Sequence, residues 1–356
     1  MNRTDLYQAD EEMLARSERQ QKHFRRQRWA AAAAAIVLAA AMIGGLFLPA
    51  GSSPLTTTAY AVSEAKYPEM PKYPEPTSKT YSQDYEAWLA AVRAQKQEAG
   101  YADGLEAYFA AGIRQFLSGA GSENRACSPL NIYMSLAMLA ELTDGSSRQQ
   151  ILTLLGTDSI EALRSQAGAV WNANYRNDGS TTSILANSLW LRDNITYHQT
   201  TLDTLSQTCY ASSFRGKMGS EELNEALRTW LNDQTGGLLK DQTRDISLDT
   251  DTIMAIASTI YYQASWNEKF DKISTAADTF HSAAGDVTCD FMHRSDTGSY
   301  YRGDGFSAVS RTLANDGGTM WLILPDEGIT PEQLLAKDEW MKLILSGSEG
   351  TQEKRL

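Results

Sequence analysis

The chain has 356 residues, of which 42% are hydrophobic and 9% aromatic, enough apolar material for one large domain or two average ones. Its formal net charge of −12 is unevenly distributed, because residues 1–28 carry seven Lys/Arg against five Asp/Glu and the remainder therefore sums to −14. The acidic character of residues 29–356 argues against a nucleic-acid partner, since phosphate contacts need a basic face.

The cysteines and histidines exclude further classes of site. Cys127, Cys209 and Cys289 are odd in number and far apart, so they form no disulfide framework and are expected to be buried free thiols, or to include one pair. The four histidines show no pairing at metal-ligand spacing. No metal and no cofactor is predicted.

Residues 29–49 form an uncharged, Ala-rich run of 21 residues, and about 20 are needed to span a hydrocarbon core. Six Lys/Arg lie within residues 16–28, whereas the first basic residue after the run is Lys66. By the positive-inside rule, residues 1–28 are a cytoplasmic tail, 29–49 an uncleaved membrane anchor, and the rest is extracellular. A cleaved signal with secretion remains the alternative, since Ala59-Tyr60-Ala61 has the small-x-small shape of a cleavage site.

Residues 50–84 are polar and Pro-rich and contain a short tandem repeat, 66–71 followed by 72–76. Prolines at this density favour extended polyproline-like backbone, so the segment is interpreted as a stalk rather than as a recognition peptide. The globular domain, 85–356, is predicted to begin with an amphipathic helix around Trp88.

The first part of this domain is predicted to be helical. Apolar residues at three- and four-residue spacing place one helix over 105–117. Ser128 has the character of an N-cap, with Pro129 at the first helical position, where its missing N–H costs nothing. The helix that follows, 130–142, is apolar on nearly every side and should lie buried, and 146–155 is expected to form the next helix.

Two near-continuous apolar runs, 183–191 and 253–262, have strand length and are typical of strands buried on both faces. Between them lies an amphipathic helix that Ser220 can cap, and it should pack over the sheet. After Trp266, short strand candidates alternate with turn signals at 284–286, 302–305 and 316–318. Mixed helix and sheet without a regular βαβ repeat predicts the α+β class.

Seven segments, in this order and spacing, resemble the motifs of the serpin family of serine protease inhibitors. Ala186-Asn187-Ser188-Leu189-Trp190, for example, is similar to the family's Ala-Asn-Ala-Leu-Trp strand. The segments are 127–156, 186–191, 223–239, 258–270, 279–281, 291–293 and 322–327. The resemblance covers about residues 100–340. It implies a helical N-terminal half packed on a large mixed sheet, with smaller antiparallel sheets.

What the resemblance implies for function is a one-shot inhibitor of serine or cysteine endopeptidases, not an enzyme. A serpin offers an exposed loop as substrate, and the cleaved loop inserts into the main sheet while the protease is still acylated. Ser128, Pro129, Asn131 and Ser258 would lie in the sheet-opening (shutter) region, and Trp266 in the loop-entry (breach) region. Asn131 stands where the family has a serine, and Ser258 where it has an asparagine that helps to hold the sheet closed. No catalytic residue is implied, and a monomer is expected.

The sequence departs from the family pattern after residue 345, since the hinge, the reactive loop and the terminal strands are not found before Leu356. No reactive-site residue can therefore be named, and the chain is interpreted as a truncated form. The alternative function is a non-inhibitory surface protein that uses the same fold for binding or adhesion. Arg302-Gly303-Asp304 is interpreted as a turn rather than an adhesion motif. A hydrolase is disfavoured because no Gly-x-Ser-x-Gly, phosphate-binding or His-Glu-x-x-His motif is present.

Overall fold

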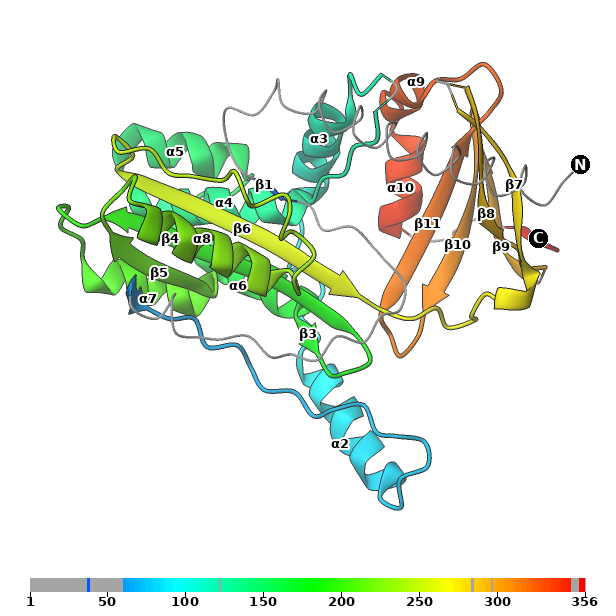
Figure 1. Ribbon diagram of the computed structural model, residues 1–356, viewed down its shortest axis with the longest axis horizontal. Coiled ribbons are helices and arrows are strands. Elements are labelled where there is room, and N and C mark those ends of the chain that lie inside the picture. The colour runs from blue at the N-terminus through cyan, green and yellow to red at the C-terminus, as the bar shows by residue number, and fades with distance from the viewer. Residues whose placement is uncertain are drawn as a thin grey trace, which may run out of the picture. The chain divides into compact units, whose positions relative to one another are not determined.

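The computed structural model describes residues 37–38, 60–121, 123–282, 285–295, 297–346 and 352–355 (Figure 1). The chain divides into two compact units, 1–36 and 37–356, and the described residues all belong to the second. The predicted tail, 1–28, and the predicted anchor, 29–49, lie outside the described residues except for Val37–Leu38. Among the described helices, none combines the length and the apolar character that crossing a bilayer requires.

A central sheet organises the unit, with strand order β1–β6–β4–β5–β2 and β3 paired to β4. β4 runs antiparallel to β6 and parallel to β5. The strands are β1 Val37–Leu38, β2 Ala61–Ser63, β3 Arg176–Asn177, β4 Thr182–Arg192, β5 Ala211–Gly216 and β6 Met254–Gln263. The two long strands predicted from the sequence, 183–191 and 253–262, are confirmed as β4 and β6.

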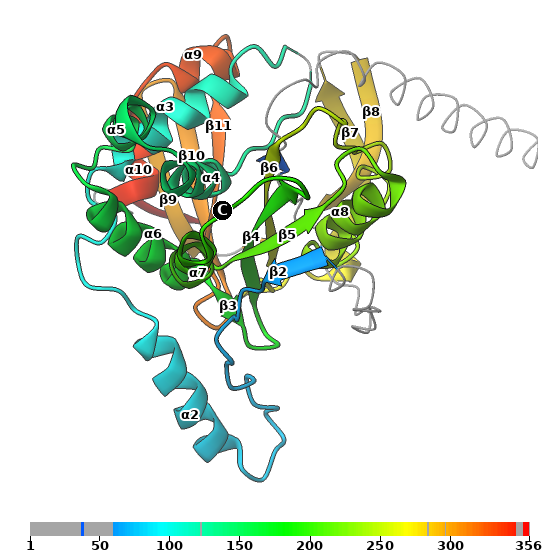
Figure 2. The ribbon, with the colours of Figure 1, turned by 90° about the vertical axis from the view of Figure 1, so that its left-hand side faces the viewer.

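Helices cover both faces of this sheet, which is why its central strands have continuous apolar sequences (Figure 2). One face carries α4 Pro129–Leu142, α5 Gly145–Leu154, α6 Ile160–Asn174 and α7 Gln199–Thr208, and the other carries α8 Glu221–Gln234. Along β4, Leu185 and Leu189 join the apolar cluster with α4–α7, whereas Ala186 and Trp190 join the cluster with α8. The alternation is that of a strand with two buried faces.

The helix ends follow the local sequence. The Ser128 hydroxyl accepts a hydrogen bond from the Asn131 N–H at 3.4 Å, with Pro129 at the first helical position. Ser220 caps α8 in the same manner, through the Leu223 N–H, whereas the Asp144 carboxylate at the start of α5 accepts from the Gly145 N–H. The predicted buried helix is confirmed as α4.

The N-terminal part differs from the predicted stalk. Residues 60–80 run along the domain before α2 Tyr81–Ala94 and α3 Leu105–Leu117. Their backbone is extended, as the prolines predict, but β2 pairs with β5 and the Tyr67 ring packs against both apolar clusters of the central sheet. Residues 60–73 of the predicted stalk are therefore packed on the domain, because the aromatic residues between the prolines find partners there.

A second sheet follows, antiparallel and ordered β11–β10–β9–β12. Its apolar cluster is centred on Phe306, which side chains of α3, α9 and α10 cover. A separate hairpin pairs β7 with β8. These elements are β7 Thr275–Ser282, β8 Gly285–Met292, β9 Thr297–Gly303, β10 Phe306–Leu313, β11 Gly318–Pro325, α9 Pro331–Leu335, α10 Glu339–Ser346 and β12 Gln352–Arg355. The α+β class, with a large mixed sheet and smaller antiparallel sheets, is confirmed.

The three cysteines are free thiols, and the expectation that all would be buried is wrong. Cys209 is buried and Cys127 partly so, whereas Cys289 is exposed. Cys289 lies on β8, which has β7 as its one strand partner among the described residues and is exposed along most of its length. A two-stranded hairpin leaves more strand surface open to solvent than a sheet covered by helices.

Candidate functional site

A buried polar cluster lies where α4 crosses the centre of the sheet. The Asn131 Nδ2 donates to the Ser258 Oγ at 2.8 Å, and the Ser258 hydroxyl donates to the Asn187 Oδ1 at 2.7 Å. The Asn187 Nδ2 in turn donates to the Cys209 carbonyl at 2.7 Å. Asn131, Asn187 and Ser258 are 0%, 0% and 1% exposed. One hydrogen-bonded chain therefore joins α4, β6, β4 and the C-terminal end of α7.

The local sequence explains how these side chains meet. Asn187 and Ser258 are register partners on β4 and β6, so they face the same side of the sheet. The Ser128 cap and Pro129 fix the start of α4, which places Asn131 in its first turn above them. A hydroxyl can donate and accept at once, and Ser258 uses both capacities to bridge two amides.

This cluster is incompletely satisfied. The Asn131 Oδ1 is buried without a hydrogen-bond partner among the described residues. An unpaired buried polar atom costs about 1–3 kcal/mol, so the contact between helix and sheet is weaker here than an apolar layer would be. The cluster is held together by neutral hydrogen bonds between side-chain amides, a hydroxyl and a backbone carbonyl.

The far edge of β6 passes directly beside the cluster. Val37 and Leu38 pair in parallel with Ser258 and Thr259. Apart from these two residues, the described part of the chain gives that edge of β6 no strand partner. Unpaired backbone groups on such an edge can receive another strand.

The structure brings three of the predicted site residues together and leaves one elsewhere. Ser128, Asn131 and Ser258 meet at the cluster, with Pro129 at the adjoining helix start. Trp266 lies beyond the end of β6, where its backbone bridges to Leu313 of β10 and its ring meets Phe270 edge-on at 5.7 Å. Trp266 thus links the two sheets, and its role in loop entry stays a prediction.

A second polar cluster was not predicted. The buried Asp178 accepts from the Trp88 Nε1 at 2.8 Å and from the Arg176 Nε at 2.7 Å. Its other oxygen accepts from the N–H groups of Ser180 and Thr181 at 2.9 and 2.8 Å. Burial opposes ionisation, but these hydrogen bonds outweigh it and hold the pKa of Asp178 below its ordinary value. The Asn-Asp-Gly sequence at 177–179 signals a turn, but nothing in the sequence connects it to Trp88.

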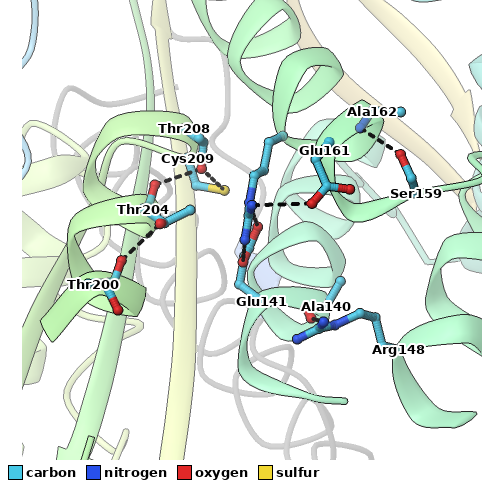
Figure 3. Close-up of polar contacts among 11 residues, drawn as sticks. Ala140, Glu141, Arg148, Ser159, Glu161, Ala162, Thr200, Thr204, Thr208 and Cys209 are labelled. Atoms are coloured by element: carbon cyan, nitrogen blue, oxygen red, sulfur yellow. Dashed lines mark hydrogen bonds and ion pairs between the residues drawn. The ribbon is translucent and has the colours of Figure 1, made fainter. Parts of the chain in front are cut away.

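A third set of polar contacts joins the helices that cover the α4 face of the central sheet (Figure 3). The buried Glu141 of α4 accepts two hydrogen bonds from Arg164 of α6, at 2.6 and 2.8 Å. Burial, with an added contribution from Glu141, raises the pKa of the nearby Cys209 thiol to about 12, although a contact from Thr208 opposes the shift. A buried thiol that stays protonated at neutral pH cannot serve as a nucleophile. Among the described residues, no group of three or more His, Cys, Asp or Glu side chains could hold a metal ion.

The sheet enclosed between α4 and α8, the separate antiparallel sheet and the polar cluster below α4 define an α+β protein of the serpin fold. Residues 106–354 match the family model described as "Serpin (serine protease inhibitor)". The crystal structure of tengpin, a thermophilic serpin, in its latent state aligns with a TM-score of 0.64 at 19% identity, covering 73% of this chain and 71% of tengpin. The chain belongs to the serpin family, and the resemblance inferred from its motifs is confirmed.

Curated relatives agree with this assignment. Serpin-Z1A of Triticum aestivum is 24% identical over 217 residues, which cover 58% of this chain and 54% of the relative. Serpin-ZX of Arabidopsis thaliana is 27% identical over 177 residues, which cover 48% of this chain and 45% of the relative. The chain thus spans about half the length of the curated relatives it matches.

Proposed function

We propose that this protein inhibits serine or cysteine endopeptidases by offering an exposed loop that, once cleaved, inserts into the central sheet while the protease remains covalently attached. The proposal concerns the whole protein, since the chain spans about half the length of the curated relatives it matches. No residue of this chain is assigned as the cleavage site, and no residue is assigned a catalytic role.

The observation that carries the proposal is the edge of β6 beside the buried polar cluster, where the described residues provide no strand partner beyond Val37–Leu38. An inserting strand would gain backbone hydrogen bonds along β6. To admit it, the sheet must shift under α4, and the contacts at that point are short, neutral hydrogen bonds among Asn131, Ser258 and Asn187. Such bonds can be exchanged as the strands move, whereas interlocked apolar side chains would resist.

The test uses protein expressed from its complete reading frame and a panel of trypsin-like, chymotrypsin-like, elastase-like and papain-like proteases. The expected result is a protease complex that survives SDS and appears together with loss of protease activity. Cleavage of the protein without such a complex would contradict the trapping mechanism. Asn187→Leu, which breaks the cluster, should lower the yield of complex relative to cleaved product.

A second candidate function is binding without inhibition, and exposed apolar side chains favour it. Phe280 of β7 and Val287 of β8 are register partners, and each is 53% exposed. Apolar surface of this kind often marks a binding site. A partner captured reversibly from solution, with no protease complex in the panel, would select this function.

We further propose that residues 29–49 anchor the protein in the cell membrane with the domain outside, as a monomer. The uncharged run and its one-sided basic flank support this orientation. The protein should sediment with membranes and be digested by protease added to intact cells. Release into the medium with a new N-terminus near residue 60 would instead favour a cleaved signal, and dimers in solution would contradict the monomer.

A further inference from the structure

Residues 60–73, named here the N-terminal strap, precede the region that the family model matches and lie along the central sheet. The strap leads into α2, and Figure 2 shows it passing from β2 at the sheet edge toward α2. Three sets of contacts fasten it to the domain.

The first contact closes the edge of the sheet. Ala61 and Ser63 pair with Phe214 and Ser213 of β5, and the Ala65 N–H donates to the Ser212 Oγ at 3.1 Å. The Tyr60 ring lies so close to Gly216 that a Cβ added there would approach it to 3.1 Å. The outer edge of β5 is therefore covered by a paired strand, β2.

The second contact is the Tyr67 ring, which packs against the apolar clusters on both faces of the sheet. Its ring centre lies 5.4 Å from Trp171, 5.8 Å from Tyr175 and 6.4 Å from Tyr210. The Tyr175 hydroxyl donates to the carbonyl of Pro68 at 3.0 Å. Trp171 belongs to α6 and Tyr210 directly precedes β5, so one ring joins the helix layer to the sheet edge.

The third contact holds the end of the strap on the turn between β3 and β4. The Tyr73 N–H donates to the Asp178 carbonyl at 2.7 Å, and the Tyr73 ring meets Trp88 edge-on at 5.0 Å. Trp88 itself donates to the Asp178 carboxylate. The strap is thus attached at β5, at the end of α6 and at the β3–β4 turn.

We propose that the strap is a conformational lock on the central sheet, which must release Tyr67 before β4 and β5 can move relative to α6. This inference rests on the proposed function, because strand insertion is what requires the movement. A segment bonded to both moving layers resists their displacement, and its prolines reduce the freedom gained on release. Loss of the strap should make it easier for β4 and β5 to move relative to α6. It should leave the dynamics of the sheet formed by β9–β12 unchanged.

The test compares amide hydrogen exchange of Tyr67→Ala with that of the parent chain, and needs no protease. Exchange should accelerate about tenfold or more in β5 and the adjoining part of β4, with β10 and β11 unchanged. Tyr101→Ala, at a tyrosine that is 37% exposed and outside the strap, is the matched control and should alter neither region. Equal acceleration in both sheets, or none, would overturn the lock.

A milder variant covers the case in which Tyr67→Ala fails to fold. Ser212→Ala removes only the acceptor for the Ala65 N–H and should accelerate exchange within residues 60–65 and β5 alone. A second readout is uptake of a strand-length Ala/Thr peptide carrying a fluorophore, which Tyr67→Ala should speed about tenfold. Equal uptake rates would argue against the lock. Uptake by neither protein would count against the proposed function, while hydrogen exchange still decides on the strap.

Discussion

Asn187 and Ser258 stand opposite each other on β4 and β6, and the Ser258 hydroxyl donates a 2.7 Å hydrogen bond to the Asn187 side-chain carbonyl. The same hydroxyl accepts from Asn131 of α4 at 2.8 Å. A single small side chain therefore couples two strands to the helix above them. Removing it would leave the Asn131 Nδ2 and the Asn187 Oδ1 unpaired in a layer without solvent access.

Ser258→Ala should destabilise the protein by about 1–3 kcal/mol, the range for leaving buried polar groups unpaired. Urea unfolding monitored by tryptophan fluorescence measures this change. Ser82→Ala, at an exposed serine of α2, serves as the control and should stay within about 0.5 kcal/mol of the parent. An equally small effect at Ser258 would mean that the amides find other partners.

Arg164→Met should destabilise by about 2 kcal/mol, because it leaves the buried Glu141 carboxylate without its cation, although Arg164 itself is partly exposed to screening solvent. Adding Glu141→Gln to this variant removes the uncompensated charge and should recover much of the loss. Thermal unfolding of the parent, the single variant and the double variant tests the pair. A double variant no more stable than Arg164→Met would show that charge is not the cause.

Asp178→Asn should make the free energy of unfolding depend less on pH in the acidic range. The folded pKa of Asp178 lies below its unfolded value, which is about 3.9. The carboxylate therefore contributes stability above about pH 4 that is lost as the pH falls through the folded pKa. The variant should be less stable than the parent at neutral pH, and the difference should narrow toward about pH 3.

Thermal unfolding at several pH values between these limits checks the Asp178 prediction. Asp158→Asn, at an exposed aspartate, is the matched control and should follow the parent at every pH. If the difference in stability between Asp178→Asn and the parent stays constant with pH, the prediction is wrong.

Gly216→Ala should destabilise by about 1–3 kcal/mol, because the new Cβ would meet Leu223 at 2.8 Å and the Tyr60 ring at 3.1 Å. Limited proteolysis should also reach residues 60–65 sooner. Gly112→Ala is the matched control, since nothing lies within 4 Å of the new atom and alanine favours the interior of α3. It should stabilise by up to about 1 kcal/mol.

Local signals in the sequence predicted what local physics determines. Ser128 and Pro129 marked the start of α4, and unbroken apolar runs marked strands with two covered faces. The order of the motifs also identified the family. These predictions succeeded because each depends on a short segment or on an ordered set of segments.

What the sequence could not reveal depends on partners far along the chain. Proline density at 60–76 correctly predicted extended backbone, but only the aromatic pocket formed by Trp171, Tyr175 and Tyr210 determines that Tyr67 is packed rather than held away. The Trp88–Asp178 hydrogen bond spans 90 residues, and no local pattern signals it. Cys289 was expected to be buried because cysteine usually is, yet it lies on an open hairpin.

The distant attachment of the N-terminal strap has a consequence for the order of folding. Its hydrogen bond from Ala65 to Ser212 bridges 147 residues. During synthesis the strap emerges first, yet its docking surface is complete only when β5 has been made. Closing so long a loop is slow compared with forming α4 or the β10–β11 hairpin. Docking of the strap should therefore be a late event, completed after the core beneath it has assembled.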